Sequence, residues 1–211
     1  LTDISVFETA RPDGTIAYQN IYDEAGRLVT QMPYGSADIT DPRNPVLTNP
    51  LATIGYYDSG NIAYTLYTSP DANNNIYLHY TDEAIDWDGD GTIEPTENYG
   101  RVDYQLLDAP DTAGALAYHN FYNTEGIMTH QELFDSLNIA NPENPQTGAL
   151  IGTLYRYIDT DNRPEALLRV NPDASGYIYH HYTNEDFSGR GYGLTDISVF
   201  ETARPDGTIA Y

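Results

Sequence analysis

Apolar and polar side chains alternate in several short stretches of the chain with the two-residue period of a β-strand. Residues 76–80 (IYLHY) and 15–18 (TIAY) combine this alternation with residue types that favour strands. Further strands are expected at residues 4–7, 27–31, 54–57, 62–67, 102–107, 150–157 and 166–170. Helical periodicity is nearly absent, and only residues 130–137 (HQELFDSL) have the pattern of a short helix.

A Pro-Asp pair precedes several of the expected strands. Proline presets φ at the second position of a turn, and aspartate accepts hydrogen bonds from the backbone that follows it. Each pair therefore predicts a β-hairpin. The pairs are Pro12-Asp13, Pro70-Asp71, Pro110-Asp111, Pro172-Asp173 and Pro205-Asp206. The proline-rich stretches 42–50 and 142–145 are expected to be ordered loops, because both halves of the chain carry them at the same position.

The first eighteen residues, LTDISVFETARPDGTIAY, recur without a change at residues 194–211. The two copies begin at positions 1 and 194, so the period is 193 residues. We interpret this as a cut from a tandem array of nearly identical periods, which makes the chain an interior piece of a longer protein. The alternative is a terminal segment that was duplicated by design.

Each period also contains an older internal duplication. Residues 14–31 align with 114–131, residues 41–45 with 141–145, and residues 69–83 with 171–185. These matches divide the chain into a β repeat unit at 1–100, a second unit at 101–193, and the start of the next period at 194–211. The first unit is longer mainly because of an insertion around Asp86. Short strands at this density predict an all-β fold of tandem antiparallel β units, each a meander or small sandwich, stacked end to end.

The charge of the chain restricts its partners. Nine Arg and no Lys stand against 32 Asp and Glu, which gives a formal net charge of −23 at pH 7. Such a surface repels phosphate groups, so neither nucleic acid nor anionic membranes are expected as partners. No apolar run approaches the roughly 20 residues that cross a bilayer, so membrane insertion is not expected.

The remaining composition indicates a compartment. Cysteine is absent, which excludes disulfides and thiolate metal sites and leaves oxygen donors for any cation. An acidic, lysine-free chain with 20 Tyr is typical of secreted surfaces, so an extracellular or cell-surface location is expected. The tyrosines are interpreted as core and cross-strand ladder residues, with a carbohydrate-binding platform as the alternative.

Residues 86–97 (DWDGDGTIEPTE) form the one motif with a defined chemistry. Carboxylates stand at positions 1, 3, 5, 9 and 12 of this stretch, a glycine stands at position 6, and position 7 offers a backbone carbonyl. Hard oxygen donors at this spacing supply the roughly six to eight ligands that Ca²⁺ prefers. The second unit lacks the motif, so one Ca²⁺ is expected per period; the alternative is an acidic turn without metal. The predicted metal ligands are Asp86, Asp88, Asp90, Thr92, Glu94 and Glu97.

Two stretches resemble known families. Residues 86–97 resemble the calcium loop of EF-hands and dockerins, although Pro95 and the strand-like residues 76–81 do not supply the usual flanking helices. Residues 12–29 resemble the YD repeats of Rhs-type and teneurin-type surface proteins through a glycine turn, alternating aromatics, Tyr22-Asp23 and the run 26–28 (GRL). The second resemblance implies hairpin geometry and an extracellular β architecture.

No constellation of catalytic residues stands out, and the chain is not expected to be an enzyme. His79 and His181 occupy equivalent strand positions and are expected to be half-exposed strand residues. His180 and His181 are adjacent, so they face opposite sides of a strand and cannot chelate together. No metalloprotease spacing, nucleophile elbow or glycine-rich phosphate loop occurs.

Near-identical repetition favours a structural role, because copy number then sets length. The leading hypothesis is a calcium-stabilised extracellular or cell-surface filament whose partners are copies of itself, with the first strands of one unit packing onto its neighbour. The alternative is a glycan-binding repeat adhesin or a YD-like shell segment. Exposed coplanar tyrosine rings in a groove would favour glycan binding, whereas packed rings would favour the filament. A glycoside hydrolase, the third hypothesis, needs two carboxylates roughly 5 to 9.5 Å apart in a cleft.

Overall fold

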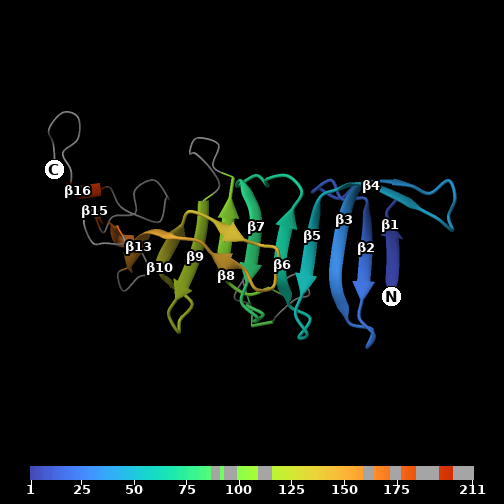
Figure 1. The fold of residues 1–211 in the computed structure, drawn as a ribbon, viewed down its shortest axis with the longest axis horizontal. Helices are drawn as coiled ribbons and strands as arrows, with labels where there is room; N and C mark the ends of the chain where they lie inside the picture. Colours follow the sequence, from blue (N-terminus) through green and yellow to red (C-terminus); the bar gives the residue numbers. More distant parts are fainter. Residues whose placement is uncertain are drawn as a thin grey trace. The chain divides into compact units, whose positions relative to one another are not determined.

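The computed structural model describes residues 1–86, 91–92, 99–108, 116–158, 164–171, 177–183 and 195–201. These residues form strands, turns and loops, and they contain no helix. The main ladders are antiparallel and follow one another in meander order (Figure 1). The all-β prediction is therefore confirmed. Within the described ranges, no helix has the length and apolar character needed to span a membrane.

The chain packs as two compact units. Unit 1 comprises Leu1–Ala115 together with Asn138–Gln146, and unit 2 comprises Leu116–Leu137 together with Thr147–Tyr211. These units are defined by contacts, whereas the boundaries 1–100, 101–193 and 194–211 are defined by sequence similarity and stay predictions. Unit 1 thus includes Asn138–Gln146, a segment from the middle of the chain.

Unit 1 contains a sheet in the order β1-β2-β3-β5-β6-β7-β8, and β4 pairs with β3 beside it (Figure 1). Buried side chains alternate with half-exposed ones along β7, so that Asn75, Tyr77 and His79 share the buried face. The strands are β1 Thr2–Val6, β2 Ala17–Tyr22, β3 Leu28–Asp38, β4 Val46–Pro50, β5 Ala52–Tyr56, β6 Ile62–Tyr67, β7 Asn75–Tyr80 and β8 Val102–Leu107.

Unit 2 contains the order β9-β10-β13-β14-β15-β16. The strands of unit 2 are β9 Leu116–Tyr122, β10 Met128–Phe134, β13 Leu150–Ile158, β14 Pro164–Val170, β15 Tyr177–Tyr182 and β16 Thr195–Phe200. Two short strands, β11 Leu137–Asn138 and β12 Gln146–Thr147, form a separate two-stranded ladder that flanks residues 139–145, which belong to unit 1.

Two predictions of secondary structure were wrong. Residues 130–137 do not form a helix but lie in β10 and at the start of β11. β10 is paired on both sides, with β9 and β13, and this non-local pairing overrides the helix propensity of its Glu and Leu residues. The stretch 42–50 is not all loop, because Val46–Pro50 forms β4. β4 pairs with β3 alone, and such an edge position tolerates proline.

The Pro-Asp turns behave as predicted where they are described. The Asp13 carboxylate accepts a hydrogen bond from the Thr15 N–H (2.9 Å), in the turn between β1 and β2. The Asp71 carboxylate accepts bonds from the N–H groups of Asn73 and Asn75 (both 2.8 Å), in the turn between β6 and β7. Residues 110–111, 172–173 and 205–206 lie outside the described residues.

In both units a tyrosine ring fills the same position on the sheet, but the ring comes from the second strand of the pair in unit 1 and from the first in unit 2. In unit 1, Tyr64 of β6 lies opposite Gly55 of β5, and its ring occupies the space that a Cβ on Gly55 would need. In unit 2 the sizes are reversed, because Ala166 of β14 lies opposite Tyr157 of β13. One large ring per strand pair therefore covers this position in each unit.

Replacing Gly55 with valine is expected to destabilise unit 1 by about 1–3 kcal/mol, because the new side chain displaces the Tyr64 ring. The double variant Gly55→Tyr/Tyr64→Ala reproduces the arrangement of unit 2 and should recover most of that loss. Urea unfolding followed by circular dichroism measures both. Equal stabilities for Gly55→Val and the parent chain would contradict the packing described.

Candidate functional site

Only the beginning and the middle of the predicted calcium loop are described. The Gly91 N–H donates to Asp86 Oδ2 at 2.7 Å, and Gly91 has a φ of +88°, the left-handed conformation of a sharp turn. Asp86 is half-buried and Thr92 is exposed. Asp88, Asp90, Glu94 and Glu97 lie outside the described residues, so the ligand set stays a prediction. Within the described residues, no group of three or more His, Cys, Asp or Glu side chains is placed to hold a metal ion.

His79 lies in a buried hydrogen-bonded chain that joins β7 to β8 and to the end of β5. Its Nδ1 lies 2.6 Å from Asp103 Oδ1, and its Nε2 lies 3.3 Å from the Tyr57 hydroxyl. That hydroxyl also donates to the Tyr80 carbonyl at 2.6 Å. The His79 ring therefore lies between a carboxylate oxygen at Nδ1 and a hydroxyl oxygen at Nε2. His79 is 7% exposed, which corrects the prediction of a half-exposed histidine.

We call Tyr57, Tyr64, Tyr77 and His79 the covered face of unit 1. Tyr77 is fully buried, and its hydroxyl donates to the Pro142 carbonyl at 2.5 Å. Burial raises the pKa of Tyr64, with a further contribution from the charge of Glu143. Both partner groups belong to Asn138–Gln146, so this segment of the chain covers the face.

Two half-buried tyrosines of unit 1, Tyr57 and Tyr80, predict a loss of stability in alkali. Burial raises the pKa of Tyr57 and of Tyr80 from 10.0 to about 12. Below pH 10 both hydroxyls are neutral in the folded and unfolded chain, and the full stability is present. Between pH 10 and about 12 the unfolded chain ionises first, so stability falls. Urea midpoints should drop across this window and drop less in Tyr57→Phe; a flat profile to about pH 12 would contradict the burial.

Unit 2 carries an equivalent face that is less buried among the described residues: Tyr157 is exposed, and Leu168, Tyr179 and His181 are half-buried. Tyr179 lies opposite Leu168, as Tyr77 lies opposite Leu66, and His181 lies opposite Ala166, as His79 lies opposite Tyr64. We call Tyr157, Leu168, Tyr179 and His181 the open face of unit 2. They line a shallow pocket of about 470 Å³ together with Glu165 and Ala166. Tyr157 is 48% exposed, in contrast to the buried rings of unit 1.

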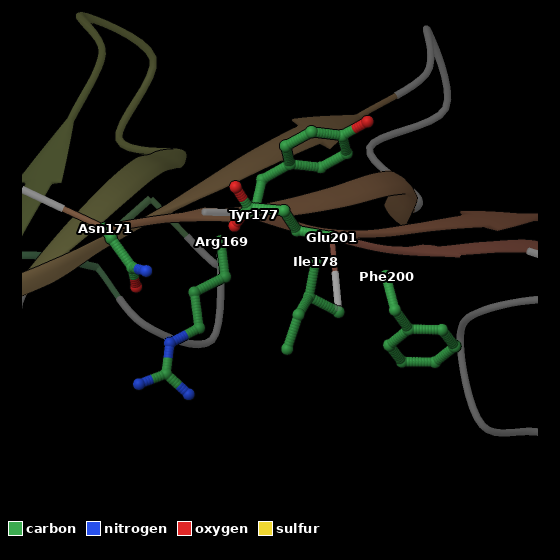
Figure 2. Close-up of a pocket in the computed structure, with 6 residues that line it drawn as sticks. All are labelled: Arg169, Asn171, Tyr177, Ile178, Phe200 and Glu201. Carbon is green, nitrogen blue, oxygen red and sulfur yellow. The ribbon is translucent and has the colours of Figure 1, made fainter. Parts of the chain in front are cut away.

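The opposite side of β15 holds a smaller pocket of about 200 Å³. Arg169, Ile178 and Phe200 are cross-strand neighbours on β14, β15 and β16 and point to the same side, whereas Tyr177 points to the other (Figure 2). Among the residues that line the pocket, Phe200 alone has a ring on that side, and this ring meets that of His180 edge to face. A groove of about 670 Å³ in unit 1 is likewise lined by a single ring, that of Tyr67. Neither hollow has the paired coplanar rings of a carbohydrate platform.

His180 is separated from His181 as expected from strand alternation. Its Nδ1 lies 2.9 Å from the Ser198 hydroxyl, so the interaction joins β15 to β16. Sequence reasoning missed Asp103, Tyr57 and Pro142 as partners of the histidine and tyrosine positions. The repeat alignment holds one usable signal, since Asp103 is the third residue of the second unit, where the first unit has Asp3.

No model of a known protein family matches the chain, and no curated protein matches it either.

Proposed function

We propose that the chain is part of an extracellular or cell-surface filament built from tandem β repeats and stabilised by calcium. The observation that carries the proposal is that one strand sequence uses opposite edges in its two copies. The stretch TDISVF at residues 2–7 contributes β1, and its identical copy at residues 195–200 forms β16. β1 pairs with β2, whereas β16 pairs with β15.

The hydrogen bonds of β1 use the odd-numbered residues. The Phe7 N–H donates to the Ile16 carbonyl, and the Tyr22 N–H donates to the Leu1 carbonyl, both at 2.8 Å. Along an antiparallel strand the N–H and C=O groups point alternately to one edge and the other. The even-numbered residues of β1 therefore direct their N–H and C=O groups to the edge away from β2.

The copy in unit 2 uses the complementary set. The Glu201 N–H donates to the Tyr177 carbonyl at 3.1 Å, and Glu201 corresponds to the even-numbered Glu8. Even positions of the strand thus bond to β15 and odd positions to β2. A single copy can make both sets of bonds at once, so successive periods can share this strand in one continuous sheet, without an exposed edge where they join.

The side chain of Asp3 lies at the edge where β1 would pair with the preceding period. Asp103 Oδ1 accepts the Tyr104 N–H at 2.9 Å and also faces His79. Asp3 Oδ1 already accepts the Ile4 N–H at 2.9 Å on the edge of β1 away from β2. In a joined array Asp3 would take the role of Asp103, with a histidine at the position of His181 as its partner.

Calcium binding and the extracellular location are proposed from the sequence. The bond from Gly91 to Asp86 supports a turn in which the carboxylates of residues 86–97 converge on one ion. The net charge of −23 keeps neighbouring filaments apart and makes their association sensitive to divalent cations. Partners are copies of the chain, and the proposed role is not enzymatic.

Titration calorimetry is expected to give one Ca²⁺ bound per 193-residue period, with a rise in melting temperature from ligand linkage. Asp88→Asn should weaken binding because it removes one charged ligand. Asp108→Asn, outside the loop, is the matched control. If the parent chain gives neither binding heat nor a rise in melting temperature, the calcium site is refuted, and the proposal of a continuous sheet is not affected.

A glycan-binding adhesin or a YD-like shell segment stays the alternative. The buried rings of the covered face favour the filament over the adhesin, because a sugar platform needs exposed rings. Tyr157 and Tyr179, which line the pocket of the open face, are the rings that an adhesin would use. The filament proposal expects no specific binding when a glycan array is probed with the chain, and binding that is lost in Tyr157→Ala would favour the adhesin.

Electron microscopy of a chain of several periods tests the proposal. Six of the described strands of each sequence unit lie on the main ladder. A continuous sheet with strands about 4.8 Å apart then has an axial repeat of about 29 Å per unit and about 58 Å per period. Filaments with these spacings are expected. Separate globules of constant size would overturn the proposal.

A further inference from the structure

The open face of unit 2 is the equivalent of a face that, in unit 1, is covered by a defined segment of the chain. That segment is residues 138–145, the tip of the β11–β12 ladder, and it contributes the Pro142 carbonyl that accepts the Tyr77 hydroxyl. The sequence aligns residues 38–45 with it, and these form the tip of the β3–β4 hairpin. Pro42 and Pro142 are both the forty-second residue of their sequence units.

The two segments have the same local conformation. In residues 138–145 the Ala140 N–H donates to the Asn138 side chain (3.0 Å), and the Asn144 N–H donates to the Asn141 carbonyl (3.1 Å). In residues 38–45 the matching bonds run from Thr40 to the Asp38 side chain (2.9 Å) and from Asn44 to the Asp41 carbonyl (3.0 Å). The turn is therefore preformed in both, which lowers the entropy that docking would cost.

The apolar side chains of residues 138–145 are more buried than those of residues 38–45. Ile139 and Pro142 are half-buried and Pro145 is buried. At the matching positions, Ile39 is 54% exposed, Pro42 is exposed and Pro45 is half-buried. The apolar side chains that unit 1 buries in one segment are thus presented to solvent by the other, and the β3–β4 hairpin extends past the edge strand β1 in the view of Figure 1.

We infer that residues 38–45 of a second copy of unit 1, placed after residue 193, dock on the open face of unit 2. The Tyr179 hydroxyl then donates to the carbonyl of Pro42, as the Tyr77 hydroxyl donates to that of Pro142. Each unit is thereby clasped to the one before it by a hairpin as well as by sheet pairing. The inference rests on the proposed filament, since it names the contact between successive units.

Charge supports this occupant. Residue 143 of the covering segment is Glu, whereas the matching residue of the free segment is Arg43. Glu165 lines the pocket of the open face, where unit 1 has Ala63. The change from Glu143 to Arg43 thus coincides with a new acidic residue at the face that the segment would cover, while Asp38 and Asp41 in place of Asn138 and Asn141 leave both segments with a net charge of −1.

The test uses a chain of two periods, in which residues 1–193 are followed by the complete 211 residues. Tetranitromethane nitrates accessible tyrosines, and peptide mass spectrometry locates the modification. Ile178→Val in the first period marks its Tyr179 peptide by mass, and this side chain points away from the face of Tyr179. Tyr179 of the first period should react at least about tenfold more slowly than Tyr179 of the second, which has no following unit.

Replacing residues 41–45 of the second period with Gly and Ser should restore the reactivity of the first Tyr179. The matched control replaces residues 141–145 of the 211-residue chain and should expose Tyr77. Equal reactivity of the two Tyr179 residues, with Tyr77 protected, would overturn the clasp. Microscopy of longer chains decides separately whether a filament forms, so the two failures are distinguishable.

Discussion

Deleting residues 194–211 is expected to convert the chain from a monomer into an open head-to-tail polymer. In the 211-residue chain, β16 fills the edge of β15. Without it, that edge accepts the identical strand β1 of another molecule, whose even-numbered residues direct their backbone groups outward. The two edges are complementary and lie on different units, so the contact is heterologous and does not close. Sedimentation velocity should show mass rising with concentration in the deleted chain alone.

Val6→Pro in the deleted chain should abolish this assembly. Val6 is even-numbered, so proline removes an N–H that points away from β2 and leaves the β1–β2 pairing intact. Val6→Thr keeps the N–H and should still polymerise. A peptide of residues 194–201 should shorten the polymers by capping β15. A deleted chain that stays monomeric with an unchanged strand signal in circular dichroism contradicts the shared-strand account.

Replacing Asp103 with alanine is expected to destabilise unit 1 by about 3–5 kcal/mol. The change leaves His79, which is 7% exposed, with its Nδ1 N–H unpaired. Breaking a buried pair from one side costs this much because the remaining group keeps its desolvation penalty. Urea unfolding of the full chain should therefore show an early transition that belongs to unit 1.

Asp103→Asn is the matched variant, because it retains an oxygen acceptor for Nδ1 and should cost about 1 kcal/mol. His79→Leu with Asp103→Leu removes both polar groups and should recover part of the loss. If Asp103→Ala unfolds with the parent midpoint, the buried chain from Tyr57 through His79 is not a stabilising element.

The pattern of residue types predicted those strands and turns whose conformation depends on interactions between neighbouring residues. The alternation at residues 62–67 and 102–107 gave β6 and β8 with their observed bounds. Asp13 and Asp71 fold their turns through bonds to residues two to four positions away. Such interactions lie within one short stretch of sequence, so the residue types alone reveal them.

Non-local contacts could not be predicted in the same way. Residues 130–137 contain helix-favouring side chains, and only the two neighbouring strands make them a strand. Proline content marked residues 142–145 as a loop, but nothing local revealed that Pro142 meets Tyr77, 65 positions away. The pairing of His79 with Asp103 likewise depends on the register of β7 with β8.

The repeat carried information that local pattern lacked. Eighteen identical residues predict that one strand has two environments, and the structure places its copies on the edges of β2 and β15. The calcium ligands are a different case, since four of the six lie outside the described residues and rest on their spacing alone.

Disulfide trapping tests the shared strand most directly, because the natural chain has no cysteine. His180 lies opposite Ser198, which corresponds to Ser5. Odd positions form non-hydrogen-bonded pairs with β15, with Cα atoms about 4.5 Å apart, a distance that a disulfide spans. In the chain lacking residues 194–211, His180→Cys with Ser5→Cys should give a ladder of covalent oligomers on oxidation. Ile178→Cys with Ser5→Cys, two residues out of register, should give few, and equal yields from the two pairs would contradict the account.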